Sequence, residues 1–351
     1  MYIFFYTFAA DLETTVRTYY KVAEHIFAIE TQNSALQSLM ANYEPFEVHC
    51  TPATESGAIF AVKIAQNGLL SDSERTVYQH VFTDQSEEDM PRIEVYKKGY
   101  SISEGQEEQQ GEWLMRVSMI AKSPICCEIV CSADFTKGML YIAHDCHDMR
   151  FCIDNALMLL YAFRTAPLMT LEMHAAVVVR GDRAPQNATS VFGDPAEAMG
   201  REGDEARAYL FLGHSGTGKS THARQWLQAF PDAWLLNDDN PILRVMENGE
   251  VRVYGSPWSG KTPCYKNAHA RVGGIIKLSQ APHNRIQSLS LPQAYAYILS
   301  SASGLKIDKQ MADHLYESIK HIITHVQCYH LDCLPNTHAA EVCYERVKTG
   351  R

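Results

Sequence analysis

Eight residues, Gly213–Ser220, combine the residue types that bind the phosphates of ATP. Their sequence, GHSGTGKS, fits the pattern G-x-x-x-x-G-K-[ST]. Glycines let backbone N–H groups approach phosphate oxygens, because no Cβ obstructs them. Lys219 is expected to reach the β- and γ-phosphates, and Ser220 is expected to ligate Mg²⁺. The predicted nucleotide-binding residues are Gly213, His214, Ser215, Gly216, Thr217, Gly218, Lys219, Ser220 and Thr221.

The elements around this loop are those that a phosphate-binding loop requires. The apolar run 208–212 predicts a strand that leads into the loop, and 221–230 predicts a helix that follows it and stops at Pro231. The N-terminus of such a helix stabilises bound anions through its dipole. The alternative, a chance match in a flexible Gly/Ser turn, does not explain this context.

A second candidate group is the acidic doublet Asp238-Asp239, directly after the apolar run 234–236. A strand that ends in carboxylates can place a metal-holding acid beside bound phosphates. Two adjacent carboxylates near Mg²⁺ can divide the work, since one can hold the metal while the other accepts a proton from an attacking hydroxyl. Taken alone, the doublet could also be a solvated turn before Pro241.

Two further features have a functional and a structural interpretation. The segment 254–266, YGSPWSGKTPCYK, is rich in Gly, Pro and hydroxyl residues and contains Lys261. It could close over a substrate, or it could be an ordinary surface loop. His174 lies in the apolar run LEMHAAVVV, and a single histidine in such a strand is more often a core residue than a ligand.

Composition restricts the partners. The chain has 41 acidic and 31 basic residues and a formal net charge of -10, so nucleic acid and anionic membranes are not expected as partners. No apolar stretch approaches the roughly 20 residues that span a bilayer. Its ten cysteines are expected to be reduced thiols in the cytoplasm. The Cys–His clusters at 144–147 and 328–333 lack matched zinc-finger spacing and are interpreted as buried thiols.

Periodicity divides the 351 residues into a β-rich half and an α/β half. We predict a β-rich N-terminal domain at 1–150 that recognises a substrate, and a second domain at 151–351. In the first half, 14–39 is helical in character, and strands are predicted at 1–15, 57–66, 92–103, 112–120, 124–133 and 138–144. In the second half, helices are predicted at 148–165, 221–230, 291–327 with a break near 303, and 337–348. Strands there are predicted at 171–179, 208–212, 234–236, 241–246, 250–253, 270–279 and 328–331, with a long loop at 181–207.

Together these motifs resemble the kinase domain of the HPr kinase/phosphorylase family, over residues 170–348. That domain is similar in its P-loop core to ATP-dependent phosphoenolpyruvate carboxykinase. The resemblance is carried by His174, the loop GHSGTGKST, the doublet Asp238-Asp239 and the segment GSPWSGK. It implies a P-loop kinase core with a mixed sheet. The short step from the P-loop to the acidic doublet is a distinctive part of the match.

The resemblance also implies roles for individual residues. Asp238 corresponds to the general base on the acceptor hydroxyl, Lys219 to the phosphate-binding cation, and Ser220, Asp239 and His174 to the metal site. Lys261 is added as a catalytic candidate from the GSPWSGK segment. The expected activity is an ATP- and Mg²⁺-dependent kinase with a protein serine or small-molecule hydroxyl as acceptor. A carboxykinase-type lyase and a non-catalytic ATP-binding module remain alternatives, and a homo-oligomer is left open.

Overall fold

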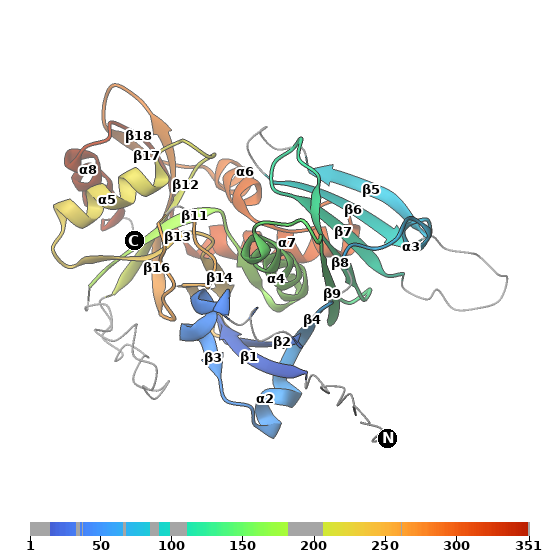
Figure 1. The fold of residues 1–351 in the computed structure, drawn as a ribbon. Helices are drawn as coiled ribbons and strands as arrows, with labels where there is room; N and C mark the ends of the chain where they lie inside the picture. The colour runs from blue at the N-terminus through green and yellow to red at the C-terminus, as the bar shows by residue number, and fades with distance from the viewer. Residues whose placement is uncertain are drawn as a thin grey trace, which may run out of the picture.

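The structure is a computed structural model that describes residues 15–32, 36, 38–65, 68–84, 91–98, 111–181, 206–260 and 262–349. In these residues the chain is a mixed α/β protein with two large mixed sheets (Figure 1). The predicted strand at 1–15, most of the predicted loop at 181–207, and Lys261 lie outside the described residues. Within the described part of the chain, no helix is both long enough and apolar enough to cross a membrane.

The described N-terminal residues form a nine-stranded sheet in which the last five strands are a meander. Its order is β3 (Glu47–Val48), β1 (Val16–Val22), β2 (His25–Thr31), β4 (Ala58–Ile64), β9 (Lys137–Ile142), β8 (Ile125–Cys131), β7 (Trp113–Ser118), β6 (Arg92–Lys98) and β5 (Tyr78–Asp84). The pairs β2–β4 and β4–β9 are parallel, and the strands from β9 to β5 pair antiparallel. Short helical segments connect the strands: η1 (Ala41–Phe46), α2 (Pro52–Gly57) and α3 (Asp72–Arg75).

The prediction of a helix at 14–39 is wrong, because most of this segment is the hairpin β1–β2. β-branched and aromatic residues, which favour strands, are frequent in both of its strands. The turn residues Ala23 and Glu24 both have positive φ, 46° and 66°. Asn-Gly is the usual sequence for a two-residue turn of this kind. Neither residue is typical of it, so nothing in the turn sequence indicates the hairpin.

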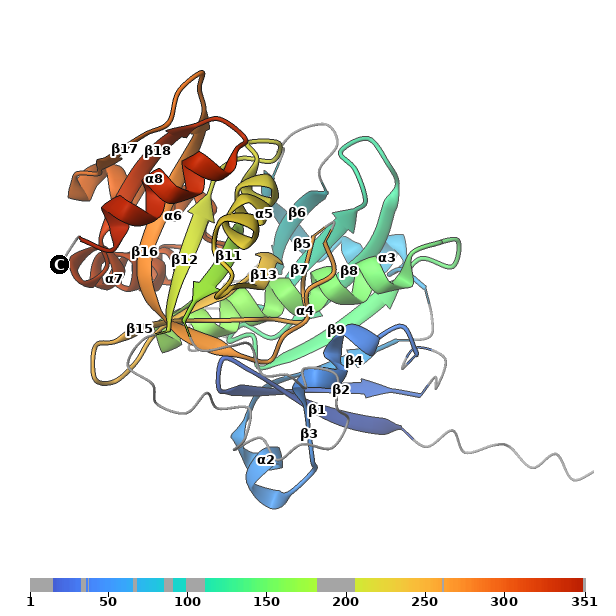
Figure 2. The same ribbon diagram turned by 90° about the vertical axis from the view of Figure 1, so that its left-hand side faces the viewer.

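Helix α4 (Met149–Thr165) confirms the helix predicted at 148–165 and lies between the two sheets (Figures 1 and 2). Its N-cap Asp148 accepts a hydrogen bond from the backbone N–H of Phe151 at 2.9 Å. The buried face of α4 belongs to one hydrophobic cluster with the first sheet, and that cluster also includes Tyr254 and Trp258. Residues on both sides of the predicted boundary at 150 therefore share one core.

The second sheet also has nine strands in the described residues. The main order is β10 (Thr170–Glu172), β14 (Ile242–Val245), β15 (Val251–Tyr254), β16 (His269–Gln280), β12 (Arg207–Leu212), β11 (Ala175–Arg180) and β13 (Ala233–Asp239); β18 (Cys328–Cys333) pairs with β16, and β17 (Arg285–Ser288) pairs with β18. Helices on both faces complete this part: η2 (Ala166–Leu168), α5 (Lys219–Ala229), α6 (Leu291–Ser301), α7 (Lys309–His325) and α8 (Thr337–Val347).

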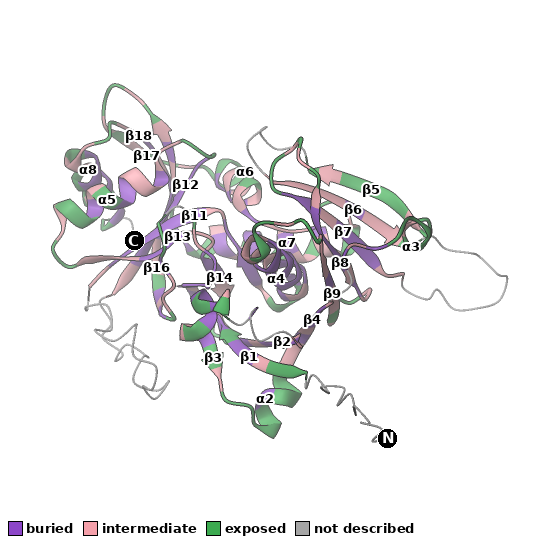
Figure 3. Cartoon of the chain, viewed as in Figure 1, coloured by how far each residue is buried: buried purple, intermediate pink, exposed green. Residues whose placement is uncertain are grey.

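Strand β11 shows why this sheet needs helices on both faces. Ala175, Val177 and Val179 pack into a cluster with α6 and α7, whereas Ala176 and Val178 pack into a cluster with α5 and α8. Successive side chains of a strand point to opposite faces, so a continuous apolar run is buried on both sides. The buried residues of Figure 3 follow this layering of helices, sheet and helices.

Most predicted elements of the second half are confirmed, including the hairpin β14–β15 and the helices around the break near residue 303. The single strand predicted at 171–179 is corrected to two strands, β10 and β11, which pair with different neighbours. His174 lies in the break between them. Strand β17 has no counterpart among the predictions, because Arg285–Ser288 is short and mostly exposed.

His25 connects the two sheets. Its Nε2 lies 2.9 Å from the hydroxyl of Thr170 on β10, and the residue is only 7% exposed. Burial and the nearby Arg244 guanidinium lower the pKa of His25 to about 3. The unfolded chain binds this proton at its ordinary pKa of about 6.5, so stability is complete above that pH and falls as the pH drops toward 3.

The variant His25→Gln should therefore show a weaker acid sensitivity. Between about pH 7 and about pH 5, the unfolding free energy of the wild type should fall by about 2 kcal/mol more than that of the variant. Urea unfolding at several pH values measures this difference. Exposed His49 is the control, since His49→Gln should retain the wild-type slope. Equal slopes for wild type and His25→Gln would contradict the burial argument.

Candidate functional site

The glycine loop has the backbone geometry of an anion-binding turn. It connects β12 to α5, and Gly216 and Gly218 have φ values of 77° and 104°, which side-chain-bearing residues rarely adopt. Gly218 is the N-cap of α5 and makes no side-chain capping bond. The first backbone N–H groups of α5 therefore have no side-chain cap, which is the arrangement that favours a bound phosphate.

Lys219 is held inside the loop. Its Nζ donates to the carbonyl of Gly213 at 3.0 Å and lies 2.9 Å from Nε2 of His174. Burial lowers the pKa of Lys219, the carboxylates of Asp239 and Asp238 raise it, and Lys277 lowers it. The ammonium group is thus partly dehydrated, and a bound phosphate would replace its lost solvent contacts.

The remaining loop positions line the entrance. His214, Ser215 and Gly216 are exposed, while Thr217 and the helical Thr221 are half-buried. The Thr217 side chain packs against Gly213, where an added Cβ would meet it at 2.9 Å. The predicted nucleotide-binding residues therefore form the turn 213–218 and the first three residues of α5, of which Lys219 is buried.

Strand β13 brings the acidic doublet to this loop. It pairs antiparallel with β11, which in turn pairs antiparallel with β12, so β13 runs parallel to β12. A bulge opposite Val177 and Val178 shifts the end of β13. Asp238 is 5% exposed, and its Oδ1 accepts a hydrogen bond from Ser220 at 2.8 Å. The structure thus joins the first turn of α5 to the first carboxylate of the doublet.

The carboxylate of Asp239, unlike that of Asp238, faces His174, and the Asp239 backbone has a positive φ. Its Oδ1 is 3.0 Å from Nε2 of His174, and both side chains are about one-third exposed, at 36% and 35%. Its φ is 136°, a conformation that costs free energy for a non-glycine residue and is often found at functional sites. His174 Nε2 therefore faces the Lys219 ammonium and the Asp239 carboxylate at once.

A buried amide fixes this doublet. Asn237 is fully buried, and its Nδ2 donates to Ser256 Oγ at 3.2 Å and to the Trp258 carbonyl at 3.0 Å. Its Oδ1 accepts from the backbone N–H of Asn240 at 2.9 Å. The segment 254–266 therefore lies directly on the end of β13.

Two glycines allow this close packing. A Cβ on Gly255 would lie 2.0 Å from the carbonyl oxygen of Lys266, and a Cβ on Gly260 would lie 3.0 Å from Oδ2 of Asp239. The backbone N–H of Gly260 also donates to the Asp238 carbonyl at 2.7 Å. The segment GSPWSG is thus shaped around the two carboxylates, up to the point where Lys261 falls outside the described residues.

Residues of the N-terminal half also contact the segment 254–260. Trp258 is 2% exposed, and its indole Nε1–H donates to the Tyr43 hydroxyl at 2.8 Å. Tyr43 in turn donates to Asp154 of α4 at 2.7 Å. Asn42 donates to the Pro257 carbonyl at 2.8 Å. The first sheet and α4 therefore set the position of the segment that packs on the doublet.

Sequence reasoning missed two charged residues, one beside the loop and one near Asp239. Lys277 on β16 is paired in register with Leu212, the residue before the loop, and burial lowers its pKa. Glu172 on β10 is 2% exposed; burial raises its pKa to about 7, against a hydrogen bond from Ser303 that lowers it. A lone charge inside an apolar strand was the available signal for both residues.

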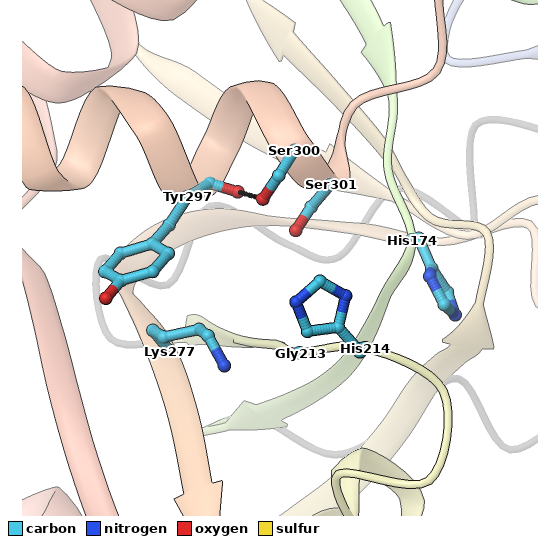
Figure 4. A pocket seen from close by; sticks show the side chains of 7 residues that line it. All are labelled: His174, Gly213, His214, Lys277, Tyr297, Ser300 and Ser301. Carbon is cyan, nitrogen blue, oxygen red and sulfur yellow. Dashed lines mark hydrogen bonds between the residues drawn. The ribbon is translucent and has the colours of Figure 1, made fainter. Parts of the chain in front are cut away.

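A small polar cavity opens between the loop and α6 (Figure 4). Its volume is about 40 Å³, which is enough to hold water. It is lined by His174, Gly213, His214, Lys277, Tyr297, Ser300 and Ser301. Figure 4 shows the Lys277 side chain beside Tyr297 and below the two serines. This cavity gives the loop a polar pocket on its α6 side.

Comparison with protein families and curated proteins assigns no family to this chain. No protein-family model matches the chain, and no curated protein matches it significantly. We therefore infer function from the residues themselves and from how the fold places them.

Replacing Gly255 tests the packing of the segment on β13. Gly255→Ala should lower the unfolding free energy by about 1–3 kcal/mol or more, because the new Cβ meets a backbone oxygen that cannot move aside alone. Gly304→Ala is the control, since its Cβ would make an ordinary contact with Leu315 at 3.5 Å. Chemical denaturation measures both, and equal effects would show that the segment is loosely packed.

Proposed function

We propose that this protein is an ATP- and Mg²⁺-dependent kinase that transfers the γ-phosphoryl group to a hydroxyl acceptor. The observation that supports this proposal most directly is a set of contacts made by Lys219 and Ser220. Lys219 and Ser220 begin α5 behind a glycine loop, and both face the carboxylates at the end of β13. Phosphoryl transfer needs a phosphate cradle, a cation site and a base in one place, and little else from the protein.

The proposal includes a P-loop kinase core of the HPr kinase and carboxykinase type. It is supported by the order strand β12, glycine loop, α5 and then β13, which runs parallel to β12 and is separated from it by β11. The His174-bearing break between β10 and β11 lies beside the same loop. Only 18 positions separate Ser220 from Asp238, which leaves room for a single helix and strand between them.

The oxygen donors of Ser220 and Asp239 suit a magnesium ion, whereas the His174 nitrogen is a ligand type that Mg²⁺ seldom takes. The Ser220 hydroxyl keeps oxygen lone pairs for a cation while it donates its proton to Asp238. Asp239 Oδ1 and His174 Nε2 are 3.0 Å apart, close to the roughly 2.9 Å between neighbouring ligands of an octahedral site with bonds near 2.1 Å. When bound there, Mg²⁺ would neutralise charge on the β- and γ-phosphates.

Asp238 is the proposed base. One carboxylate oxygen is held by Ser220, and the second would take the proton of the acceptor hydroxyl. The acceptor oxygen then forms a bond to the γ-phosphorus, while the bond from that phosphorus to the bridging oxygen breaks and ADP leaves. Lys219 would stabilise the charge on the transferred group. Segment 254–260, packed on the doublet, would exclude water from this step.

The variant Asp238→Asn separates a kinase from a passive ATP-binding module. We expect phosphoryl transfer to fall by roughly 10²–10⁴-fold, since the general base is lost, while MgATP affinity changes little. Transfer from γ-labelled ATP is measured against a panel of serine peptides, free serine and polyols, and affinity by calorimetry.

Exposed Asp313→Asn is the matched control and should behave as wild type. Normal transfer by Asp238→Asn would remove the base assignment. ATP binding without turnover in the wild type, across the whole panel, would favour the passive module, and an absence of ATP binding would refute the proposal as a whole.

Lys277 provides a second test, because it is not part of the sequence pattern of the glycine loop. Lys277→Met should weaken MgATP binding roughly tenfold, through loss of a partly buried cation one strand from the loop. Lys320→Met is the control, since that side chain is 69% exposed on α7. Calorimetric titration gives both constants, and an unchanged constant for Lys277→Met would place Lys277 outside the nucleotide site.

A further inference from the structure

Four cysteines that are scattered in the sequence meet at one end of α4. The Sγ atoms of Cys126, Cys127 and Cys152 all lie within 4.8 Å of one another. The Sγ of Cys146 is 3.4 Å from that of Cys152. All ten cysteines lie in the described part of the chain, and none forms a disulfide. The other six cysteines do not belong to this group.

A β-bulge makes the meeting possible. Val117 pairs with Cys127 and Ser118 pairs with Ile125, so Cys126 is an extra residue in β8. Consecutive strand residues normally point to opposite faces, but a bulge places two residues opposite one and re-aims their side chains. Both Cys126 and Cys127 can therefore approach Cys152.

The other two thiols come from adjacent elements. Cys152 is the fourth residue of α4, and its carbonyl lies 4.0 Å from the Cys127 Sγ. Cys146 belongs to a turn after β9, in which its N–H donates to the Ala143 carbonyl and the Ala143 N–H donates to the Cys126 carbonyl. The bulge, the turn and the helix are thus hydrogen-bonded or packed around the same point.

We propose that Cys126, Cys127, Cys146 and Cys152 form a tetrahedral thiolate site for a zinc-class divalent cation. Sulfurs around such an ion lie roughly 3.8 Å apart, given bonds of about 2.3 Å. The Sγ atoms of Cys126, Cys127 and Cys152 lie within 4.8 Å of one another, and that of Cys146 lies 3.4 Å from that of Cys152. Cys146 is outside the group of three, so its side chain must turn toward Cys126 and Cys127 for the site to close. Four thiols from three elements also exceed what one disulfide would use.

The surroundings suit thiolate ligands. Cys152 lies in the positively polarised first turn of a 17-residue helix. Cys126, Cys127 and Cys152 are buried, whereas Cys146 is partly exposed. An ion would therefore enter the site past Cys146.

Such an ion would fix the start of α4 to the first sheet. From the same helix, Arg150 donates to the Tyr265 hydroxyl at 2.6 Å and Asp154 accepts from Tyr43. Both contacts hold the segment 254–266 against the end of β13. The site is structural in this assignment, since all four positions carry protein sulfur and none is left for substrate.

Metal content of the full chain, purified under reducing conditions, tests the assignment. We expect one equivalent of zinc per chain, released by a mercurial thiol reagent. Replacement by Co²⁺ should give sulfur-to-cobalt charge-transfer absorption and the visible bands of a tetrahedral site. These bands distinguish sulfur ligands from any ion held by His174 and Asp239.

Matched variants locate the ligands. Cys146→Ser, the least buried change, should weaken Co²⁺ binding at least tenfold and remove part of the charge-transfer band. Cys131→Ser, buried on the same strand but outside the group, and His174→Ala should both keep the full spectrum.

Three outcomes would overturn the proposal. They are no zinc and no Co²⁺ spectrum in reduced wild type, a disulfide between Cys146 and Cys152 in protein isolated with thiols trapped, and a spectrum that survives in both Cys146→Ser and Cys152→Ser. The wild-type spectrum needs no variant to fold, so the test does not depend on the stability of the substituted chains.

Discussion

The position of the whole candidate site depends on one buried amide, the side chain of Asn237. A buried amide without partners is costly, so its two donors and its acceptor must be satisfied in place. They are satisfied by Ser256, Trp258 and the backbone of Asn240. This links the end of β13 to the segment 254–266 through side chains that water does not reach. The two carboxylates that follow Asn237 consequently have fixed directions, one toward Ser220 and the other toward His174.

The constraint extends into the N-terminal half through Trp258. Its indole proton is accepted by Tyr43, and the Tyr43 proton by Asp154, so a chain of buried hydrogen bonds runs from β13 to α4. Burial raises the pKa of the Tyr43 hydroxyl well above its usual value, which keeps the proton that this chain requires. The first sheet is therefore part of the structure that orients the doublet, in addition to any role in selecting an acceptor.

Local signals in the sequence were sufficient where structure is decided locally. The glycine loop between β12 and α5, the Asn248-Gly249 hairpin and the helix at 148–165 depend on turn residues and apolar period, and all three appear where they were predicted. The features that the sequence did not predict have a common cause. The hairpin at Ala23-Glu24 lacks turn residues, and Lys277, Glu172 and the four thiols acquire meaning only from partners far away in the chain. Spacing along a sequence cannot report contacts that the sheet order creates.

The charges of the site support the proposed pairing of a nucleotide with a divalent cation. Lys219 lies beside Asp238 and Asp239, and Lys277 lies near Lys219, so the protein groups around the loop contribute two positive and two negative charges. A triphosphate adds about four negative charges, and placing these in a partly buried site without compensation is costly. Two lysines already matched by two carboxylates cannot supply the compensation. A cation between the doublet and the phosphates can, because it is attracted by both, and the strained backbone of Asp239 holds the second carboxylate where such an ion would meet it.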